Sequence, residues 1–150
     1  MAPLITLVGG TGLARLLGLL GVDALDGWLP ALRAGLALMF VLTGLAHFGL
    51  GRRADLIAMV PPRLPRPDLL VTATGVLELA GAAGLLLPAT YRLAAACLAL
   101  LMVAMFPANI HAARRRVTLG GKQVTPLLPR TALQLLYIGA ALTIALSGAG

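Results

Sequence analysis

Five polar side chains stand in stretches of the chain that are otherwise apolar, namely His47, Glu78, Asn109, His111 and Gln134. Imidazole changes charge near neutral pH and binds Zn, Fe or Cu, and a carboxyl group in apolar surroundings either takes up a proton or needs a cation. These side chains could therefore bind a ligand, relay a proton or hold a metal. The sequence has no His-x-x-His or Glu-x-x-His pattern, so we expect no metal site and assign no catalytic residue. The plain alternative is a pair of histidines that bond to loop carbonyls.

The stretches that carry these residues have the length of membrane-spanning helices. About 20 apolar residues cross a hydrocarbon core of about 30 Å, and five segments come near that length: 4–22, 31–50, 69–87, 91–113 and 131–147. Of the 150 residues, 59% are hydrophobic and 11% are charged, against about 25% charged in soluble domains. We therefore predict one all-α domain over residues 1–150, an integral membrane helix bundle.

The first segment needs separate treatment because Arg15 lies near its middle. A lone charge there costs roughly 2.5–3.5 kcal/mol on insertion scales. No basic region precedes Leu4 and no Ala-x-Ala site follows, so an uncleaved helix is favoured over a signal peptide. Because Glu78 lies near the middle of the third segment, we expect either an internal Arg15–Glu78 ion pair that fixes packing or a ligand or proton role for Glu78. Gly10, Ala14 and Gly18 form a small-residue stripe that would let another helix approach.

The basic residues concentrate in two loops. Residues 51–68 contain four arginines, and residues 114–130 contain four arginines and Lys122. The positive-inside rule places both loops in the cytoplasm. The net charge of +7 does not indicate nucleic acid, because aromatic residues make up 4% of the chain and do not alternate with basic ones. Anionic lipid headgroups are the expected partners.

Other residues shape the connections. Pro107 removes a backbone hydrogen bond in the fourth span, which predicts a kink, and Asn109 is the expected local partner of the freed carbonyl. The segments 117–119 and 123–125 flank a glycine turn and predict a β-hairpin. Cys97 is the single cysteine, which excludes a thiol–disulfide exchange enzyme. Arginine outnumbers lysine eleven to one, and Ala, Leu and Gly are abundant. This bias indicates a GC-rich bacterial genome and hence a bacterial plasma membrane.

Several short motifs, in their order and spacing, resemble the DoxX-like family of small membrane proteins: Gly44-Leu45-Ala46-His47-Phe48, Met59-Val60-Pro61-Pro62-Arg63-Leu64-Pro65, Thr74 to Gly81, Gly84 to Pro88, and Phe106-Pro107-Ala108-Asn109-Ile110. The resemblance covers about residues 32–144. It implies a four-helix core, with the first helix as an N-terminal addition. On that resemblance His47, Glu78, Pro107 and Asn109 occupy recurrent polar and proline positions, and no catalytic residue can be transferred because the family is functionally mixed.

Two functional hypotheses follow. The favoured one is an accessory or scaffold subunit of a membrane complex, without catalytic activity of its own, which contacts a partner protein or further copies of itself. The alternative is a redox-linked or ligand-binding membrane protein, in which a lipophilic molecule of the quinone type enters the bundle and meets Glu78, His47 and Asn109. The sequence names no cofactor for either.

Overall fold

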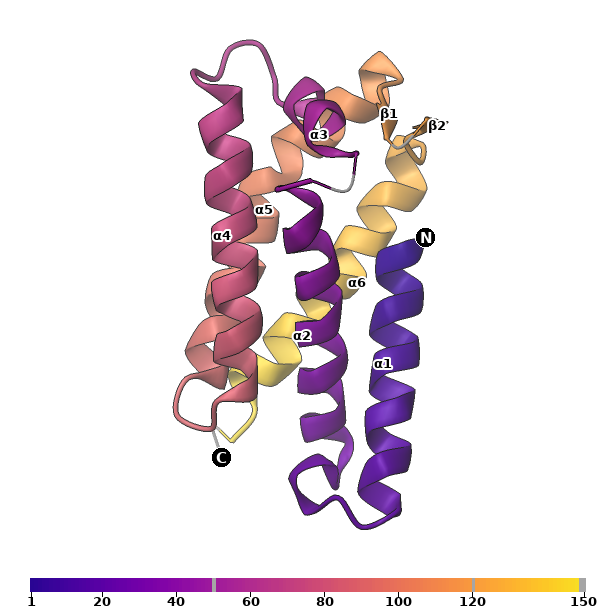
Figure 1. Cartoon of the computed structure of the whole chain (residues 1–150), viewed down its shortest axis with the longest axis vertical. Helices are drawn as coiled ribbons and strands as arrows, with labels where there is room; N and C mark the ends of the chain where they lie inside the picture. Colours follow the sequence, from indigo (N-terminus) through magenta and orange to yellow (C-terminus); the bar gives the residue numbers. More distant parts are fainter. Residues whose placement is uncertain (50, 120, 149–150) are drawn as a thin grey trace.

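The structure is a computed structural model that describes residues 1–49, 51–119 and 121–148. It is almost entirely helical (Figure 1). The elements in chain order are α1 (Ala2–Leu19), a 3₁₀ turn (Asp23–Leu25), α2 (Trp28–Ala46), α3 (Arg53–Met59), α4 (Pro67–Leu86), α5 (Tyr91–Arg115), β1 (Thr118–Leu119), β2 (Lys122–Gln123) and α6 (Leu127–Leu146).

Five of these helices, α1, α2, α4, α5 and α6, are long and apolar enough to cross a membrane. Each of them falls on one of the five predicted segments, although the boundaries shift by a few residues. The largest shift with a consequence is at α6, which begins at Leu127 rather than at residue 131. Pro126 precedes the helix and Pro129 lies in its first turn, where a proline removes no helical hydrogen bond. Arg130, predicted as a loop residue, is therefore part of α6.

The outer faces of these helices are as apolar as the inner ones. Leu93 and Leu100 of α5, Leu77 of α4 and Leu135 of α6 are all more than half exposed. Exposure of so large an apolar surface to water is unfavourable, whereas contact with the acyl chains of lipids is not. This distribution is that of a multi-pass membrane protein.

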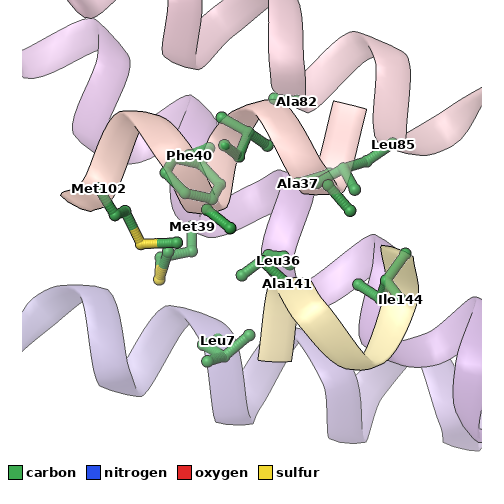
Figure 2. Close-up of a cluster of buried hydrophobic side chains, with 13 residues drawn as sticks. Leu7, Leu36, Ala37, Met39, Phe40, Ala82, Leu85, Met102, Ala141 and Ile144 are labelled. Atoms are coloured by element: carbon green, nitrogen blue, oxygen red, sulfur yellow. The ribbon is translucent and has the colours of Figure 1, made fainter. Parts of the chain in front are cut away.

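The long helices form a bundle in which α2 lies between α1 and α4, and α5 packs against both α4 and α6. Figure 1 shows α1 and α2 as an antiparallel hairpin that extends past the lower ends of α4 and α5 in that view. The core of the bundle is built around Leu36, Leu85, Leu98 and Ile144, which are fully buried. Figure 2 shows Leu36, Leu85 and Ile144 within this cluster. Leu7 is the buried contribution of α1 to this core.

Small residues set the distances between the helices. A Cβ atom at Gly35 of α2 would lie 2.1 Å from Thr11 Oγ1 of α1, and a Cβ atom at Gly75 of α4 would lie 2.5 Å from the Cβ of His47. The expected stripe on α1 is also used, because Ala14 and Gly18 are buried and Gly10 faces Gly35. Helices therefore touch through their backbones where a larger side chain would hold them apart.

One end of the bundle is covered by α3 and the β-hairpin. α3 contacts α4, α5 and β1, and Arg53 at its start donates hydrogen bonds to the carbonyl of His47 (2.7 Å) and to the hydroxyl of Thr72 (2.9 Å). The predicted hairpin is confirmed, with Thr118 paired to Gln123 in an antiparallel register. Its strands are two residues long, so it caps the bundle and builds no larger sheet.

Candidate ligand-binding cavity

A cavity of about 660 Å³ lies at the end of the bundle that α3 and the hairpin cover. It reaches from Arg52 and Lys122 at that end to Phe40 and Met102 in the interior. Four of the five predicted polar residues line it: His47, Glu78, Asn109 and Gln134. These residues come from α4, α5, α6 and the end of α2, so one cavity brings together side chains from four helices.

The fifth residue, His111, does not line the cavity. It follows Asn109 by two residues, which turns its side chain by about 200° around the helix axis. Asn109 faces the cavity, and His111 therefore points to another side of α5. Its inclusion in the predicted cluster rested on depth in the membrane and neglected the helical period.

Glu78 is held from α2. Its side chain is 4% exposed, and the hydroxyl of Thr43 donates a hydrogen bond to Glu78 Oε2 at 2.5 Å. One turn further along α2, His47 Nδ1 lies 2.9 Å from the carbonyl oxygen of Thr43. Residues four apart lie on one helix face, so Thr43 and His47 form one polar edge of the cavity.

A second polar edge joins α5 to α6. Arg130 Nη1 donates to Asn109 Oδ1 at 2.5 Å, and Asn109 Nδ2 donates to Gln134 Oε1 at 2.6 Å. Gln134 Nε2 in turn donates to the carbonyl oxygen of Met102 at 2.5 Å. This chain of hydrogen bonds uses the acceptor of Asn109 for one partner and a donor for the other, which fixes the orientation of its amide.

The interior proline lies in this region of α5, as predicted. Asn109 does not serve as a local partner for the backbone near Pro107, because its amide is engaged by Arg130 and Gln134. Gln134 of α6 donates instead to the carbonyl oxygen of Met102, the neighbour of Val103, whose carbonyl is the one that Pro107 leaves without its helical donor.

The expected Arg15–Glu78 ion pair is wrong. Arg15 Nη1 lies 3.0 Å from Asp26 Oδ1, and its guanidinium stands over the ring of Trp28. Thr11 packs at Gly35 and Glu78 packs at Gly44 of α2, so Arg15, one turn beyond Thr11, lies level with about residue 31. At a rise of about 1.5 Å per residue, Arg15 and Glu78 are separated by about 20 Å along the bundle.

Sequence reasoning missed further side chains of the cavity, among them Thr43, Arg130 and Tyr137. Arg130 was counted as a loop charge because the predicted span begins at residue 131. The spacing of Arg130, Gln134 and Tyr137 at four and then three residues is the signal that could have found them, since it places all three on one face of α6. Thr43 precedes His47 by four residues and carries the same signal on α2.

Between the polar edges the walls are apolar and flexible, with Met39, Met59, Met102, Met105 and Phe40. Figure 2 shows the Met39 and Met102 side chains beside Phe40. Within the described part of the chain, no three His, Cys, Asp or Glu side chains come together in a way that could hold a metal ion. The arrangement suits a lipophilic molecule with at least one polar end, because apolar walls with a few placed polar groups are the usual form of a small-molecule site.

No curated protein and no solved structure matches this chain. Residues 36–145, from the middle of α2 to the last turn of α6, match a family that is described as a domain of unknown function (DUF8561). The match spans most of the chain and includes both polar edges of the cavity, while α1 lies outside it. The chain therefore belongs to the DUF8561 family.

Proposed function

We propose that this protein is a multi-pass protein of the bacterial plasma membrane that binds a lipophilic small molecule with a polar end. The observation that carries this proposal is the cavity of about 660 Å³, into which four helices send polar side chains between apolar walls. Its volume lies in the range of roughly 300–1,000 Å³ that small-molecule sites occupy. A polar group inside a membrane bundle is costly, so a cluster of them is a default candidate for a functional site.

We also propose that the protein shares the architecture of the DoxX-like family. The motifs that resemble that family fall on α2, on the α3 connection, on α4 and on α5, and α2, α4, α5 and α6 form the bundle to which α1 is added. We place the basic loops 51–68 and 114–130 in the cytoplasm. The cavity then lies near the cytoplasmic leaflet.

A quinone is one ligand of the proposed type. Its ring carbonyls accept hydrogen bonds, and Arg130 and His47 offer ring or guanidinium nitrogens on the two polar edges. Its isoprenoid tail would lie along Met102 and Phe40. In this role the protein holds or presents the molecule, and no catalytic activity of its own is required.

The proposal is tested by purifying the protein from its native membrane in a mild detergent and identifying bound lipophilic molecules by mass spectrometry. We expect a molecule in stoichiometric amount in the wild type and its loss from Leu133→Trp, which fills the cavity from a half-buried wall position. Glu78→Gln tests the polar edge. Asp68→Asn is its matched control, because the same chemical change is made on the same helix at an exposed position outside the cavity. A molecule retained equally in all variants, or absent from the wild type, would contradict the proposal.

A scaffold role is the second candidate, and one observation favours it. On α1, Gly9 and Gly12 face open space, so that a Cβ atom at either position would meet no other atom within 4 Å. Such a face allows close approach of a helix from another chain. A partner protein that co-purifies with the wild type and is lost from Gly9→Leu and Gly12→Leu, while bound small molecules remain, would establish this role.

A further inference from the structure

We propose that the cavity takes a single-chain amphiphile with an anionic head, a carboxylate or a phosphate, and that Arg130 binds this head. The inference rests on the proposed function and narrows its ligand class. It distinguishes a charged amphiphile from a neutral quinone, which the same cavity could hold by its volume alone.

The first argument is the charge of the lining. Among the described residues that line the cavity, Arg52, Lys122 and Arg130 are cationic and Glu78 is the only acidic one. Glu78 lies in the middle of α4 and accepts a hydrogen bond from Thr43. The three cations lie at or near the covered end of the bundle, in the α2–α3 connection, in β2 and in the first turns of α6. The cavity therefore has a positive end and a mostly apolar interior.

The second argument is the state of the Arg130 side chain. Its Nη1 donates to Asn109 Oδ1, whereas its buried Nε has no hydrogen-bond partner in the described structure. A buried N–H group without an acceptor is unfavourable, and more so in a charged group. Carboxylate and phosphate oxygens match the planar donor arrangement of a guanidinium. An anionic head group in the cavity would bring an acceptor to this guanidinium and continue the pairing that Asn109 begins.

The third argument is that Arg130 is positioned in advance. Asn109, which accepts from Arg130, is itself held by Gln134, and Gln134 is anchored on the Met102 carbonyl. The guanidinium is therefore kept in place by α5 and by its own helix. A donor that is already oriented loses little freedom when an anion binds, which favours binding.

The interior of the cavity suits a single flexible chain. Met39, Met102 and Met105 line it together with Phe40 and Leu133. Methionine side chains are unbranched and polarizable and adapt to irregular apolar shapes. A cavity of about 660 Å³ has the size of a small-molecule site rather than of a groove for a two-chain lipid.

The experiment measures binding to the whole protein in nanodiscs of neutral phosphatidylcholine, by displacement of a fluorescent fatty acid. The competitors are oleate, oleyl phosphate, oleyl alcohol, a short-chain quinone and the two-chain lipid phosphatidylglycerol. For the wild type we expect both single-chain anions to bind roughly 10- to 100-fold more tightly than the alcohol, as a charge-assisted hydrogen bond would produce. Arg130→Gln should remove this preference and leave binding of the alcohol unchanged, whereas Arg63→Gln, at an exposed loop position, should keep it.

The outcomes separate the two proposals. An alcohol or quinone that binds as tightly as oleate, or a preference for anions that survives Arg130→Gln, would overturn the anion inference while the cavity remains a binding site. Displacement by phosphatidylglycerol as effectively as by oleate would overturn the single-chain assignment. If no competitor binds, the proposed function fails together with the inference.

The wild-type comparison of oleate with oleyl alcohol decides the question even if Arg130→Gln does not fold. Lys122→Gln then serves as the charge variant, and we expect it to lose less of the preference for anions.

Discussion

The hydroxyl of Thr43 in α2 donates a hydrogen bond to Oε2 of Glu78 in α4 at 2.5 Å, and this contact ties two helices together beside the cavity. The neighbouring residue Gly44 makes it possible. A Cβ atom at Gly44 would lie 3.3 Å from the Cβ of Glu78 and 2.9 Å from the side chain of Leu79, so that a larger residue would push α4 away. The close approach of the helices at Gly44 and the Thr43–Glu78 hydrogen bond therefore stabilise the same point of the α2–α4 interface.

Thr43→Val is expected to destabilise the protein by about 1–3 kcal/mol, because it leaves a buried carboxyl oxygen of Glu78 without its donor. Glu78→Gln should have a smaller effect, since an amide oxygen can still accept from Thr43. The midpoint of thermal unfolding in detergent measures both changes. Thr74→Val is the control on α4, where the hydroxyl bonds to the carbonyls of its own helix. Equal stability of Thr43→Val and wild type would contradict the role of this hydrogen bond.

Gly75→Val is expected to weaken the contact between α2 and α4. A Cβ atom there would lie 2.5 Å from the Cβ of His47 and 2.9 Å from the ring of Phe48, and overpacking of this kind typically costs about 1–3 kcal/mol. Gly139→Val on α6 is the matched control, since a Cβ atom at that position meets nothing within 4 Å. We expect a lower midpoint of thermal unfolding for Gly75→Val than for the control. An unchanged midpoint in Gly75→Val would show that α2 and α4 can move apart without loss of stability.

Gln134→Leu removes the side chain that links α6 to Asn109 and to the carbonyl of Met102. Hydrogen bonds between membrane helices contribute about 0.6 kcal/mol on average, so we expect a loss of about 1–2 kcal/mol for the two bonds. Thr143→Val on the same helix breaks only a bond to its own backbone and should be nearly neutral. Chemical denaturation in mixed micelles compares them. A loss in Thr143→Val as large as in Gln134→Leu would argue against a special role of Gln134.

Charge exchange distinguishes the Arg15–Asp26 pair of the structure from a pair with Glu78. Arg15→Glu should destabilise the α1–α2 hairpin by up to about 1 kcal/mol, the scale of a partly exposed ion pair. Adding Asp26→Arg should restore the stability, whereas adding Glu78→Arg should lower it further. Limited proteolysis of the connection between α1 and α2 reports on this hairpin. Rescue by Glu78→Arg would show that the two residues meet.

The proposed orientation is tested by labelling single cysteines with an impermeant maleimide, in a background in which Cys97 is replaced by alanine. Ala89→Cys in the α4–α5 connection should be labelled in intact cells, and Arg63→Cys should be labelled only after the membrane is opened. Both positions are exposed in the structure. The reverse pattern would place the basic loops and the cavity on the outer side.

Composition and periodicity determined the number, type and approximate limits of the long helices. Apolar runs of about 20 residues specify a spanning helix whatever surrounds them, because the bilayer requires that length and an internally bonded backbone. The glycine turn likewise specified the hairpin between Leu119 and Lys122. Polar residues in apolar runs indicated His47, Glu78, Asn109 and Gln134 as candidate site residues, and the structure places all four in the lining of one cavity.

Only the tertiary structure decided which polar groups are partners. The sequence shows depth along each helix but neither the rotation of a helix nor its displacement along its neighbour. Rotation separates His111 from Asn109, and displacement of α1 along α2 separates Arg15 from Glu78 and leaves Asp26 as its partner. α6 begins at Leu127, four residues before the predicted span, and this places Arg130 on the helix face that lines the cavity. Hydrogen bonds reach about 3 Å, so shifts of a single helical turn, which no hydropathy pattern records, decide which side chains meet.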